Sequence, residues 1–114
     1  MDCPFCDFIH GDAPKPRLYD DHEDFVVFEP LNPVTPGHLL VVPKEHCESA
    51  ADAPHLAGIT MVAAAWVAKF SGQANIITSI GTAATQTVFH LHIHVVPRAE
   101  GDELALPWTG QKTA

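Results

Sequence analysis

Three histidines alternate with apolar residues in the segment Phe89–Pro97, which reads FHLHIHVVP. Such strict alternation in a segment rich in β-branched residues predicts a strand with one buried face. The apolar residues would then enter the core, while the three imidazoles would line the opposite face about 7 Å apart, twice the rise per strand residue. Because a core needs no row of imidazoles, we interpret His90, His92 and His94 as nucleophiles, proton carriers or metal ligands.

The rest of the chain combines short β patterns with one helical pattern. β-Branched and aromatic runs predict further strands at 17–20, 25–28, 38–42 and 75–79. Pro54 and Gly72 bracket a helix whose cap we assign to Asp52 or Ala53. The order β-β-β-α-β-β with short connections favours an α+β fold, in which five antiparallel strands form a sheet with one main helix packed on it.

Two stretches upstream of the histidines extend the pattern. Residues 79–90 read SIGTAATQTVFH, and residues 31–46 read LNPVTPGHLLVVPKEH. Together with the alternating histidines, they resemble the histidine triad family of nucleotide hydrolases and transferases, which typically carries N-x-G-x-x-A-G-Q-x-V-x-H before the triad. Gly81, Ala84, Gln86 and Val88 match that motif, whereas Ser79 and Thr85 depart from it. The sequence CPFC at residues 3–6 is similar to the N-terminal cysteine pair of the zinc-binding, bacterial-type branch.

The resemblance implies a phosphoryl-transfer site built from four histidines. It places the nucleophile on His92 and assigns His94, His38 and His90 to the same catalytic group. An imidazole can attack phosphorus and leave again, which splits one substitution into two steps through a covalent intermediate. We therefore expect a nucleotidyl hydrolase or transferase that acts on the α-phosphate of nucleoside phosphoramidates or dinucleoside polyphosphates.

Phosphate also needs hydrogen-bond donors, and the loop 81–87 can offer backbone amides and threonine hydroxyls. The alternative is that this loop is only a hairpin connection. Many relatives bind ribose through an acidic residue in the position of Pro30, where this chain departs from the family pattern. By resemblance, the expected phosphate and nucleotide contacts are Gln86, Thr87, Thr85, Gly81, Ser79, Glu29, Leu31 and Asn32.

Cys3 and Cys6 can supply two thiolates of a tetrahedral metal site, which then needs two further ligands. His46 and His90 match the ligands of zinc-binding relatives, and Cys47 is an alternative ligand. A Cys2His2 zinc site has no open position and is structural, so we expect zinc to clip residues 1–16 to the sheet. A zinc-bound His90 could not also protonate a leaving group. Without a metal, the cysteine pair would be a redox motif, and no organic cofactor is expected.

Composition narrows the class of protein. With 114 residues and 46% hydrophobic content, the chain is long enough for one domain over residues 1–114, which ends in a tail at 101–114. A net charge of -8 with only six lysines and arginines argues against a broad nucleic-acid or anionic-membrane surface. The acidic N-terminus lacks the features of a signal peptide, and three cysteines cannot all pair, so we infer a cytoplasmic protein.

The helix at 54–70 is apolar on nearly every side. Leu56, Ile59, Ala63, Trp66 and Phe70 recur at spacings of three and four and predict its buried stripe. The opposite side is also largely apolar, and the sheet can cover one side alone. We therefore expect a homodimer through this helix, with a loop or the C-terminal tail as the alternative cover. Polar interruptions argue against a membrane span, and Trp108 is expected to pack back on the domain.

Two other functions stay open at this point. The first uses His90, His92 and His94, or two of them with His38, as ligands of an open zinc site that activates water. The second is a noncatalytic nucleotide-binding or interaction module, for which the departures from the family motif leave room. The loop of threonines and glutamine before the triad and the complete set of four histidines favour nucleotidyl transfer.

Overall fold

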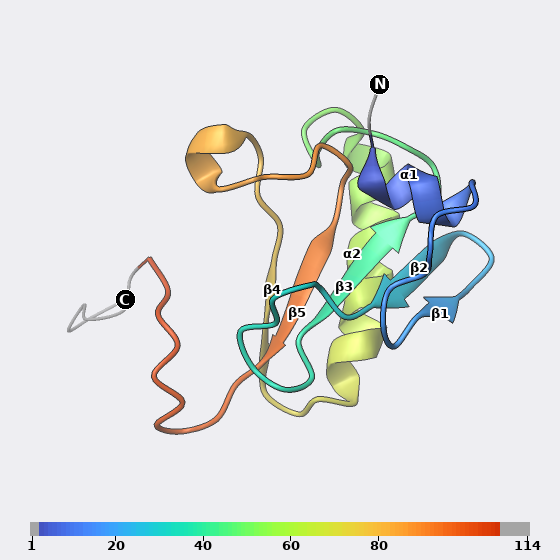
Figure 1. Ribbon diagram of the computed structural model, residues 1–114. Helices are drawn as coiled ribbons and strands as arrows, with labels where there is room; N and C mark the ends of the chain where they lie inside the picture. Colours follow the sequence, from blue (N-terminus) through green and yellow to red (C-terminus); the bar gives the residue numbers. More distant parts are fainter. Residues whose placement is uncertain (1–2, 108–114) are drawn as a thin grey trace.

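The computed structural model describes residues 3–107, which form one antiparallel sheet with helices on both of its faces (Figure 1). The strands are β1 (Asp20–Asp21), β2 (Phe25–Phe28), β3 (Leu39–Pro43), β4 (Ala74–Ile77) and β5 (Ile93–Pro97). The helices are α1 (Pro4–Ile9), α2 (Pro54–Lys69) and the short 3-10 helix η1 (Thr82–Ala84). The strands lie in the order β1-β2-β3-β5-β4, and all neighbours are antiparallel. The predicted α+β architecture is confirmed.

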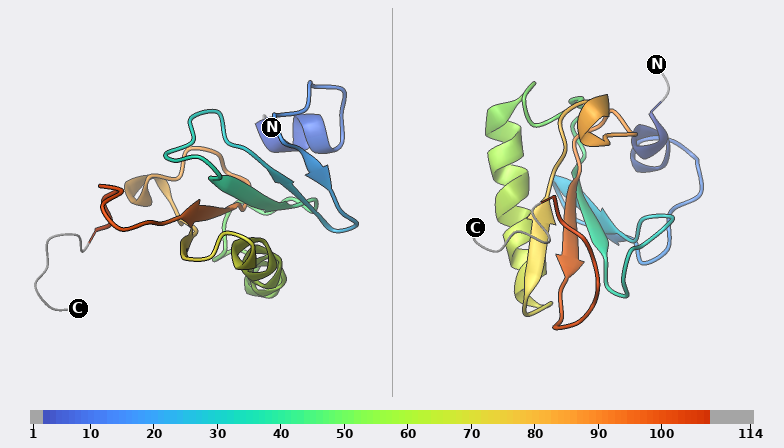
Figure 2. Two further views of the ribbon diagram at one scale, coloured as in Figure 1. Left: turned by 90° about the horizontal axis from the view of Figure 1, so that it is seen from below. Right: turned by 90° about the vertical axis from the view of Figure 1, so that its left-hand side faces the viewer.

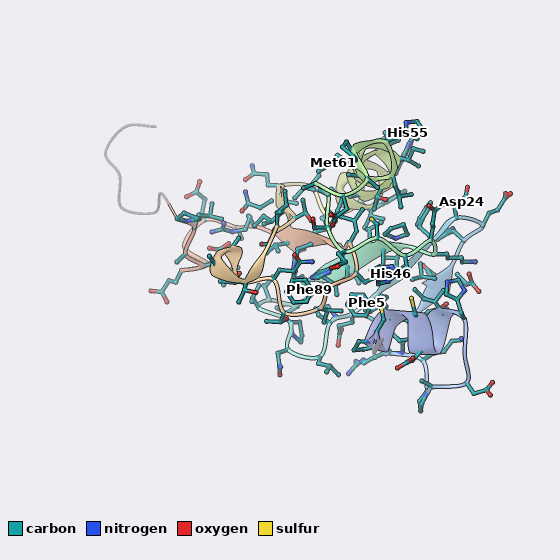
Figure 3. All side chains as sticks on the ribbon, turned by 90° about the horizontal axis from the view of Figure 1, so that it is seen from above. Phe5, Asp24, His46, His55, Met61 and Phe89 are labelled. Carbon is teal, nitrogen blue, oxygen red and sulfur yellow. The ribbon has the colours of Figure 1, made fainter. Side chains whose placement is uncertain are left out.

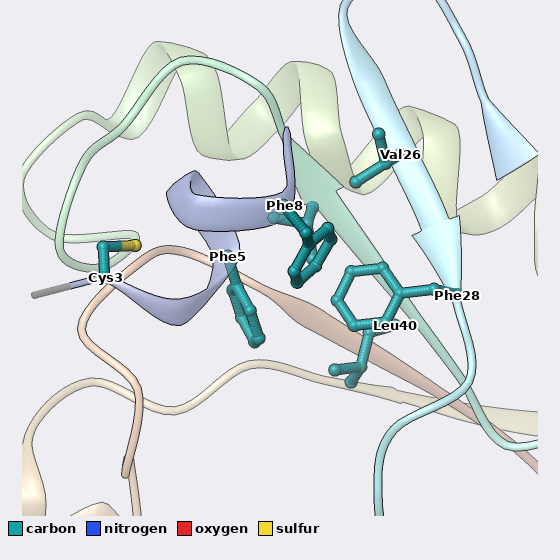
Figure 4. Packing of buried hydrophobic residues seen from close by; sticks show 7 residues of the cluster. Cys3, Phe5, Phe8, Val26, Phe28 and Leu40 are labelled. Carbon is teal, nitrogen blue, oxygen red and sulfur yellow. The ribbon is translucent and has the colours of Figure 1, made fainter. Parts of the chain in front are cut away.

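The two faces of the sheet pack against different helices, with α2 on one side and α1 on the other (Figure 2). Alternate residues of each strand point to opposite faces, which divides the core into two clusters. The cluster on the α2 face contains Val27, Val41, Ile93 and Val95 from the strands with Ala63 and Ala64 from the helix. The cluster on the α1 face contains Val26, Phe28, Leu40 and Val42 with Cys3, Phe5 and Phe8 (Figure 4). Along the histidine segment, the predicted burial of Leu91, Ile93 and Val95 is confirmed.

Within the N-terminal segment that zinc is expected to clip to the sheet, residues Pro4–Ile9 form the helix α1. Pro4 occupies the first helical position, where its missing N–H costs no hydrogen bond. The Sγ atom of Cys3 accepts a hydrogen bond from the backbone N–H of Cys6 and so caps the helix. Aromatic edge-to-face packing, with ring centroids 5.0 to 5.9 Å apart, then holds α1 on the sheet through Phe5, Phe8 and Phe28.

Strand boundaries differ from the predicted ones, most clearly beside the histidines. β5 begins at Ile93 instead of Phe89, because Leu91 donates its N–H to the carbonyl of Cys47 and not to a neighbouring strand. The strand predicted at 17–20 is reduced to Asp20–Asp21, since Leu18 adopts a positive φ of 55°. The strands predicted at 38–42 and 75–79 run over 39–43 and 74–77.

α2 buries a different stripe from the predicted one. Thr60, Ala63 and Ala64 are buried, whereas Ile59, Trp66 and Phe70 are 48%, 61% and 88% exposed. Small side chains let a helix lie close to a sheet, and the bulky residues of α2 consequently turn away from it. Most of the large apolar side chains of this helix therefore lie on the surface of the single chain, whereas Val67 packs against the core.

The ends of α2 agree with the prediction in position. Ala53 is the N-cap residue and makes no side-chain hydrogen bond, while the carboxylate of Asp52 binds the backbone N–H and hydroxyl of Ser49. Within residues 3–107, no helix has both the length and the apolar character needed to cross a bilayer. Trp108 lies outside the described residues.

Candidate functional site

His92 lies just before β5, and its ring contacts the edge of Phe5 with centroids 5.3 Å apart. The Nδ1 atom of His92 is 2.7 Å from the backbone carbonyl oxygen of His90. A carbonyl can only accept, so Nδ1 carries the proton and the lone pair is on Nε2. Burial lowers the pKa of His92, which favours the neutral ring. This arrangement leaves Nε2 of His92 unprotonated, with a lone pair that can attack an electrophile.

His38 and His94 form a second ordered pair beside it. The backbone N–H of Val34 donates to Nδ1 of His38 at 3.1 Å, so the proton of His38 is on Nε2. That proton is donated to Nδ1 of His94 at 2.9 Å, which leaves Nε2 of His94 protonated. Burial lowers the pKa of His94 to about 4 and lowers that of His38 as well. The ring centroids of His92 and His94 are 5.2 Å apart, so a free lone pair on one ring lies near an N–H group on the other.

Four metal-binding side chains converge behind His92. The Sγ atoms of Cys3 and Cys6 and ring nitrogens of His46 and His90 lie within 4.8 Å of one another, the one such group within residues 3–107. Three S-to-N distances in the cluster are 3.4 to 3.5 Å, and the two Nδ1 atoms are 3.0 Å apart. A tetrahedral zinc ion would separate S from N by roughly 3.5 Å and N from N by roughly 3.3 Å. The cluster therefore fits a zinc ion.

The imidazoles of this cluster are oriented for a cation. Nε2 of His90 donates to the carbonyl of Pro43 at 2.8 Å, so the lone pair on Nδ1 points into the cluster. Nε2 of His46 is buried without a hydrogen-bond partner in the described part of the chain. In Figure 3, His46 lies beside α1 and Phe5, whereas His55 is on α2 across the sheet. Cys47 points its Sγ at the carbonyl of Ser49, 3.6 Å away, and is not a member of the cluster.

Gln86 is buried and holds the loop before the histidines in place. Its Oε1 accepts a hydrogen bond from the N–H of Gly81 at 2.9 Å, and its Nε2 donates to the carbonyls of Glu48 and Val88. All of these bonds are to backbone, so the side chain spans three segments of chain. The backbone N–H of Gly81 is likewise occupied, whereas Thr82, Thr85 and Thr87 are exposed and their hydroxyls are accessible donors of this loop.

A pocket of about 320 Å³ adjoins the His38 and His94 pair. It brings together the predicted residues Ser79 and Thr85 with those two histidines. Residues that sequence reasoning missed complete the lining: Val34, Asn75, Ile77, Val96, Arg98 and Leu104 to Leu106. The alternation along β5 could have identified two of these lining residues, because it continues from His94 to Val96 and Arg98.

The predicted nucleoside contacts are less closely gathered. Glu29 is half-buried and donates its backbone N–H to Arg17, while Leu31 is 96% exposed and Asn32 is also exposed. These residues follow β2, at the opposite end of β3 from the cysteine and histidine cluster. The single chain therefore presents them at the surface with no enclosed base pocket among the described residues.

The fold and the arrangement of the histidines and cysteines agree with what comparisons with known proteins find. A family model described as a HIT domain matches residues 10–101. A HIT-like protein of Mycobacterium tuberculosis is 40% identical over 113 residues, which covers 93% of this chain and 78% of that protein. Adenylylsulfatase HINT3 of Arabidopsis thaliana is 34% identical over 108 residues, 89% of this chain and 54% of that protein. A zinc-bound histidine triad family protein of Mycobacterium smegmatis superposes with a TM-score of 0.75 and 39% identity, covering 93% and 81% of the two chains.

Proposed function

This chain belongs to the HIT domain family, and from that premise we propose that it is a nucleotidyl hydrolase or transferase working through a nucleotidyl-histidine intermediate. The substrates are nucleoside phosphoramidates or dinucleoside polyphosphates, attacked at the α-phosphate. The observation that carries this proposal is the tautomer of His92, whose Nδ1 proton is held by the carbonyl of His90 and whose Nε2 is free to attack. The adenylylsulfatase relative supports the same reaction type, since its name describes cleavage beside an adenylyl group.

The reaction proceeds in two displacements. Nε2 of His92 bonds to phosphorus while the bond to the leaving group breaks, and the leaving group keeps the electron pair and takes a proton from Nε2 of His94. Water then attacks phosphorus, returns a proton to His94 and releases His92 with the nucleoside monophosphate. Transfer to another acceptor would replace water in the second step. His38 keeps the Nε2 proton of His94 in place through its own hydrogen bond to Nδ1.

The phosphate lies against the loop 81–87 in this proposal. Thr85 and Thr87 offer exposed hydroxyls, and Ser79 lies on the same side as His94. Gln86 and Gly81 contribute by fixing the loop, because their own polar groups bind each other. The nucleoside extends toward the loop after β2, where Glu29, Leu31 and Asn32 are the assigned contacts.

We further propose that Cys3, Cys6, His46 and His90 hold one structural zinc ion. Four protein ligands leave no open position, so the ion would supply rigidity and no chemistry. It would fix α1 to the sheet and fix His90, whose carbonyl orients His92. A water-activating zinc site is disfavoured because His38 and His94 offer no free lone pair. Nδ1 of each ring accepts a hydrogen bond, and Nε2 of each ring carries a proton.

We also propose the domain extent, the cellular location and the oligomeric state of the protein. The whole chain, 1–114, is one cytoplasmic domain without a broad nucleic-acid surface, and it forms a homodimer through α2. The exposed apolar residues of that helix, Ile59, Val62, Trp66 and Phe70, support the dimer because the sheet does not cover them.

The decisive experiment measures AMP release from adenosine 5′-phosphoramidate, with intact mass spectrometry for a nucleotidyl adduct. Wild type and His55→Ala, a matched change at an exposed histidine on α2, should both turn over and form the adduct, and His92→Ala should do neither. Turnover that survives His92→Ala would exclude the covalent mechanism. Nucleotide binding without turnover in wild type would favour a noncatalytic module, and activity lost on chelation without any adduct would favour an open zinc site.

A further inference from the structure

Cys3 and Cys6 lie on the same side of α1, at its first turn. The carbonyl of Cys3 accepts the N–H of Asp7 at 3.0 Å, and the Sγ of Cys3 accepts the N–H of Cys6 at 3.3 Å. In helical geometry, Cα atoms three residues apart are separated by roughly 5 Å, which is within the range of about 4.4 to 6.8 Å that disulfides span. The two Sγ atoms themselves lie within 4.8 Å of each other. A disulfide between them therefore requires no unwinding of α1.

The two thiols differ in their access to solvent. Cys3 is buried, with 6% of its surface exposed, whereas Cys6 is partly exposed. A thiol that coordinates zinc is held as the thiolate, which is the form that reacts with oxidants. An oxidant from solvent therefore meets Cys6 first, and the thiolate of Cys3 lies next to it and can complete a disulfide. Cys47 lacks this arrangement, because its Sγ points to the carbonyl of Ser49, 3.6 Å away.

Zinc bound at this cluster would join three segments that are far apart in the sequence. The ligands come from the first turn of α1, from His46 after β3 and from His90 before β5. A disulfide between Cys3 and Cys6 would close only the loop 3–6 and would link none of the other segments. Because so short a loop restricts the unfolded chain little, the disulfide cannot replace the stability that the bound metal provides.

The position of His92 depends on this cluster in two ways. The carbonyl of His90 accepts the Nδ1 proton of His92 at 2.7 Å. On α1, Phe5 packs against the rings of both His90 and His92, with centroids 5.7 and 5.3 Å apart. After loss of the metal, the ring of His90 would keep the hydrogen bond from its Nε2 to the carbonyl of Pro43 but would lose its ligation through Nδ1. His90 and α1 would then be freer to move, and His92 with them.

We propose that Cys3 and Cys6 form a peroxide-sensitive switch, in which a disulfide forms, zinc is released, and α1 and His90 lose one of their anchors. The inference rests on the zinc site proposed above. The Sγ of Cys6 attacks one oxygen of hydrogen peroxide, the O–O bond breaks, hydroxide leaves and Cys6 becomes a sulfenic acid. The Sγ of Cys3 then attacks the sulfur of Cys6, which forms the S–S bond and expels a second hydroxide. The two thiolates lose two electrons to the peroxide, and two protons from solvent convert the hydroxides to water.

Zinc release and peptide mapping test the chemistry. Zinc-loaded wild type treated with a small excess of hydrogen peroxide should release about one zinc per chain to a chromogenic chelator. The tryptic peptide 1–17, which contains Cys3 and Cys6, should become about 2 Da lighter and resist alkylation. The peptide 45–69, which contains Cys47, should still be alkylated, and Cys47→Ser should respond as wild type does. A thiol reductant with added zinc should restore the starting state.

Stability and turnover measure the consequence. The oxidised protein should melt about 10 °C below the zinc-loaded protein, the shift expected for loss of the metal. Its kcat for adenosine 5′-phosphoramidate should fall about tenfold, at the low end of the range for groups that orient a site. Protein stripped of zinc by a chelator, with its thiols kept reduced, should show the same two changes.

The outcomes separate the switch from the proposals that precede it. Zinc retained after peroxide treatment, a disulfide that includes Cys47, or an unchanged Tm after zinc release would each overturn the switch and leave the proposed reaction standing. Absence of turnover in both the reduced and the oxidised protein would overturn the proposed reaction, whereas zinc release with a lower Tm would still support the switch. Purified protein that neither contains nor takes up zinc would overturn the zinc site and the switch together.

Discussion

The Nε2 atom of His38 lies 2.9 Å from Nδ1 of His94, and this contact sets the protonation of both rings. It does so only because the backbone N–H of Val34 occupies the other nitrogen of His38. A backbone donor in the loop before β3 thereby determines which nitrogen of His94 faces the site. In the proposed mechanism, His38 is a positioning residue and His94 is the group that contacts the substrate.

We predict that His38→Leu lowers kcat for adenosine 5′-phosphoramidate by about a hundredfold, in the range typical of a lost general acid. Without the donor from His38, the proton of His94 can move to Nδ1 and leave Nε2 unable to donate. A p-nitrophenyl ester of AMP, whose leaving group needs no proton, should lose less than tenfold. His38→Gln, which can still donate, should restore part of the activity. Equal losses on the two substrates would contradict the positioning role.

A second prediction concerns the metal cluster. Purified wild type should contain about one zinc per chain, and Cys6→Ser should lose the metal and about 10 °C in Tm, corresponding to roughly 2 to 3 kcal/mol for a domain of this size. The loss should be limited because the aromatic packing of Phe5, Phe8 and Phe28 also holds α1. Cys47→Ser is the matched control and should keep the metal, since that thiol points to Ser49. Loss of zinc from Cys47→Ser but not from Cys6→Ser would make Cys47, and not Cys6, the metal ligand.

Gln86 provides a third prediction. Gln86→Ala removes the partners of one backbone N–H and two backbone carbonyls at a buried position, and we expect it to reduce the free energy of unfolding by about 2 to 3 kcal/mol. The loop 81–87 should also become more mobile, so the KM for nucleotide substrates should rise. Chemical denaturation and steady-state kinetics measure the two effects. A Gln86→Ala protein with wild-type stability would show that water replaces these bonds without cost.

Sequence reasoning recovered the architecture because β2 and β3 are short, continuous apolar runs and the histidine segment alternates around Ile93. It misjudged α2 because four large apolar residues and Ala63 recur at helical spacing and predict the core stripe. Of these, Ala63 is buried, together with Ala64, since small side chains let the helix approach the sheet. Periodicity identifies the candidate faces of a helix, and packing distance decides between them.

The candidate site could likewise be predicted from the sequence only in part. The four histidines and the cysteine pair carried a recognisable spacing, so their residues could be named from the sequence. Arg98 continues the alternation of β5, but Asp102 carried no such spacing, because its role depends on the turn after β5. Hydrogen bonds across that turn, and the tautomers of the histidines, depend on backbone groups that no side-chain pattern reveals.

The fourth prediction is a pH dependence of stability. Burial lowers the pKa of His94 to about 4, while an unfolded histidine titrates near 6.5. Between these values the unfolded chain binds the proton and the folded chain does not, so stability falls as pH falls from about 6.5 toward 4. One such group contributes at most about 1.4 kcal/mol per pH unit. His94→Gln should therefore flatten the pH dependence of the unfolding free energy between pH 7 and 5, measured by urea denaturation. An unchanged slope would show that His94 titrates normally in the folded protein.

The exposed face of α2 leads to the last prediction, which concerns oligomeric state. Val62, Trp66 and Phe70 are 60%, 61% and 88% exposed, an unusual amount of large apolar surface for a monomer. Light scattering after gel filtration should give twice the chain mass of 12.3 kDa, and the Tm should rise with protein concentration. Trp66→Glu places a charge in the centre of this face and should yield the monomer at micromolar concentration, because an unpaired buried charge is costly.

Leu18→Glu is the matched control for that experiment, since Leu18 is 60% exposed and lies in the loop before β1 instead of on α2. It introduces the same charge and removes a large apolar side chain of equal exposure, so it should remain dimeric. A wild type that stays monomeric at 100 µM would show that the α2 face is not covered by a second copy of the chain. A Trp66→Glu protein that stays dimeric would instead place the interface elsewhere, with the unpaired edge of β4 as the next surface to test.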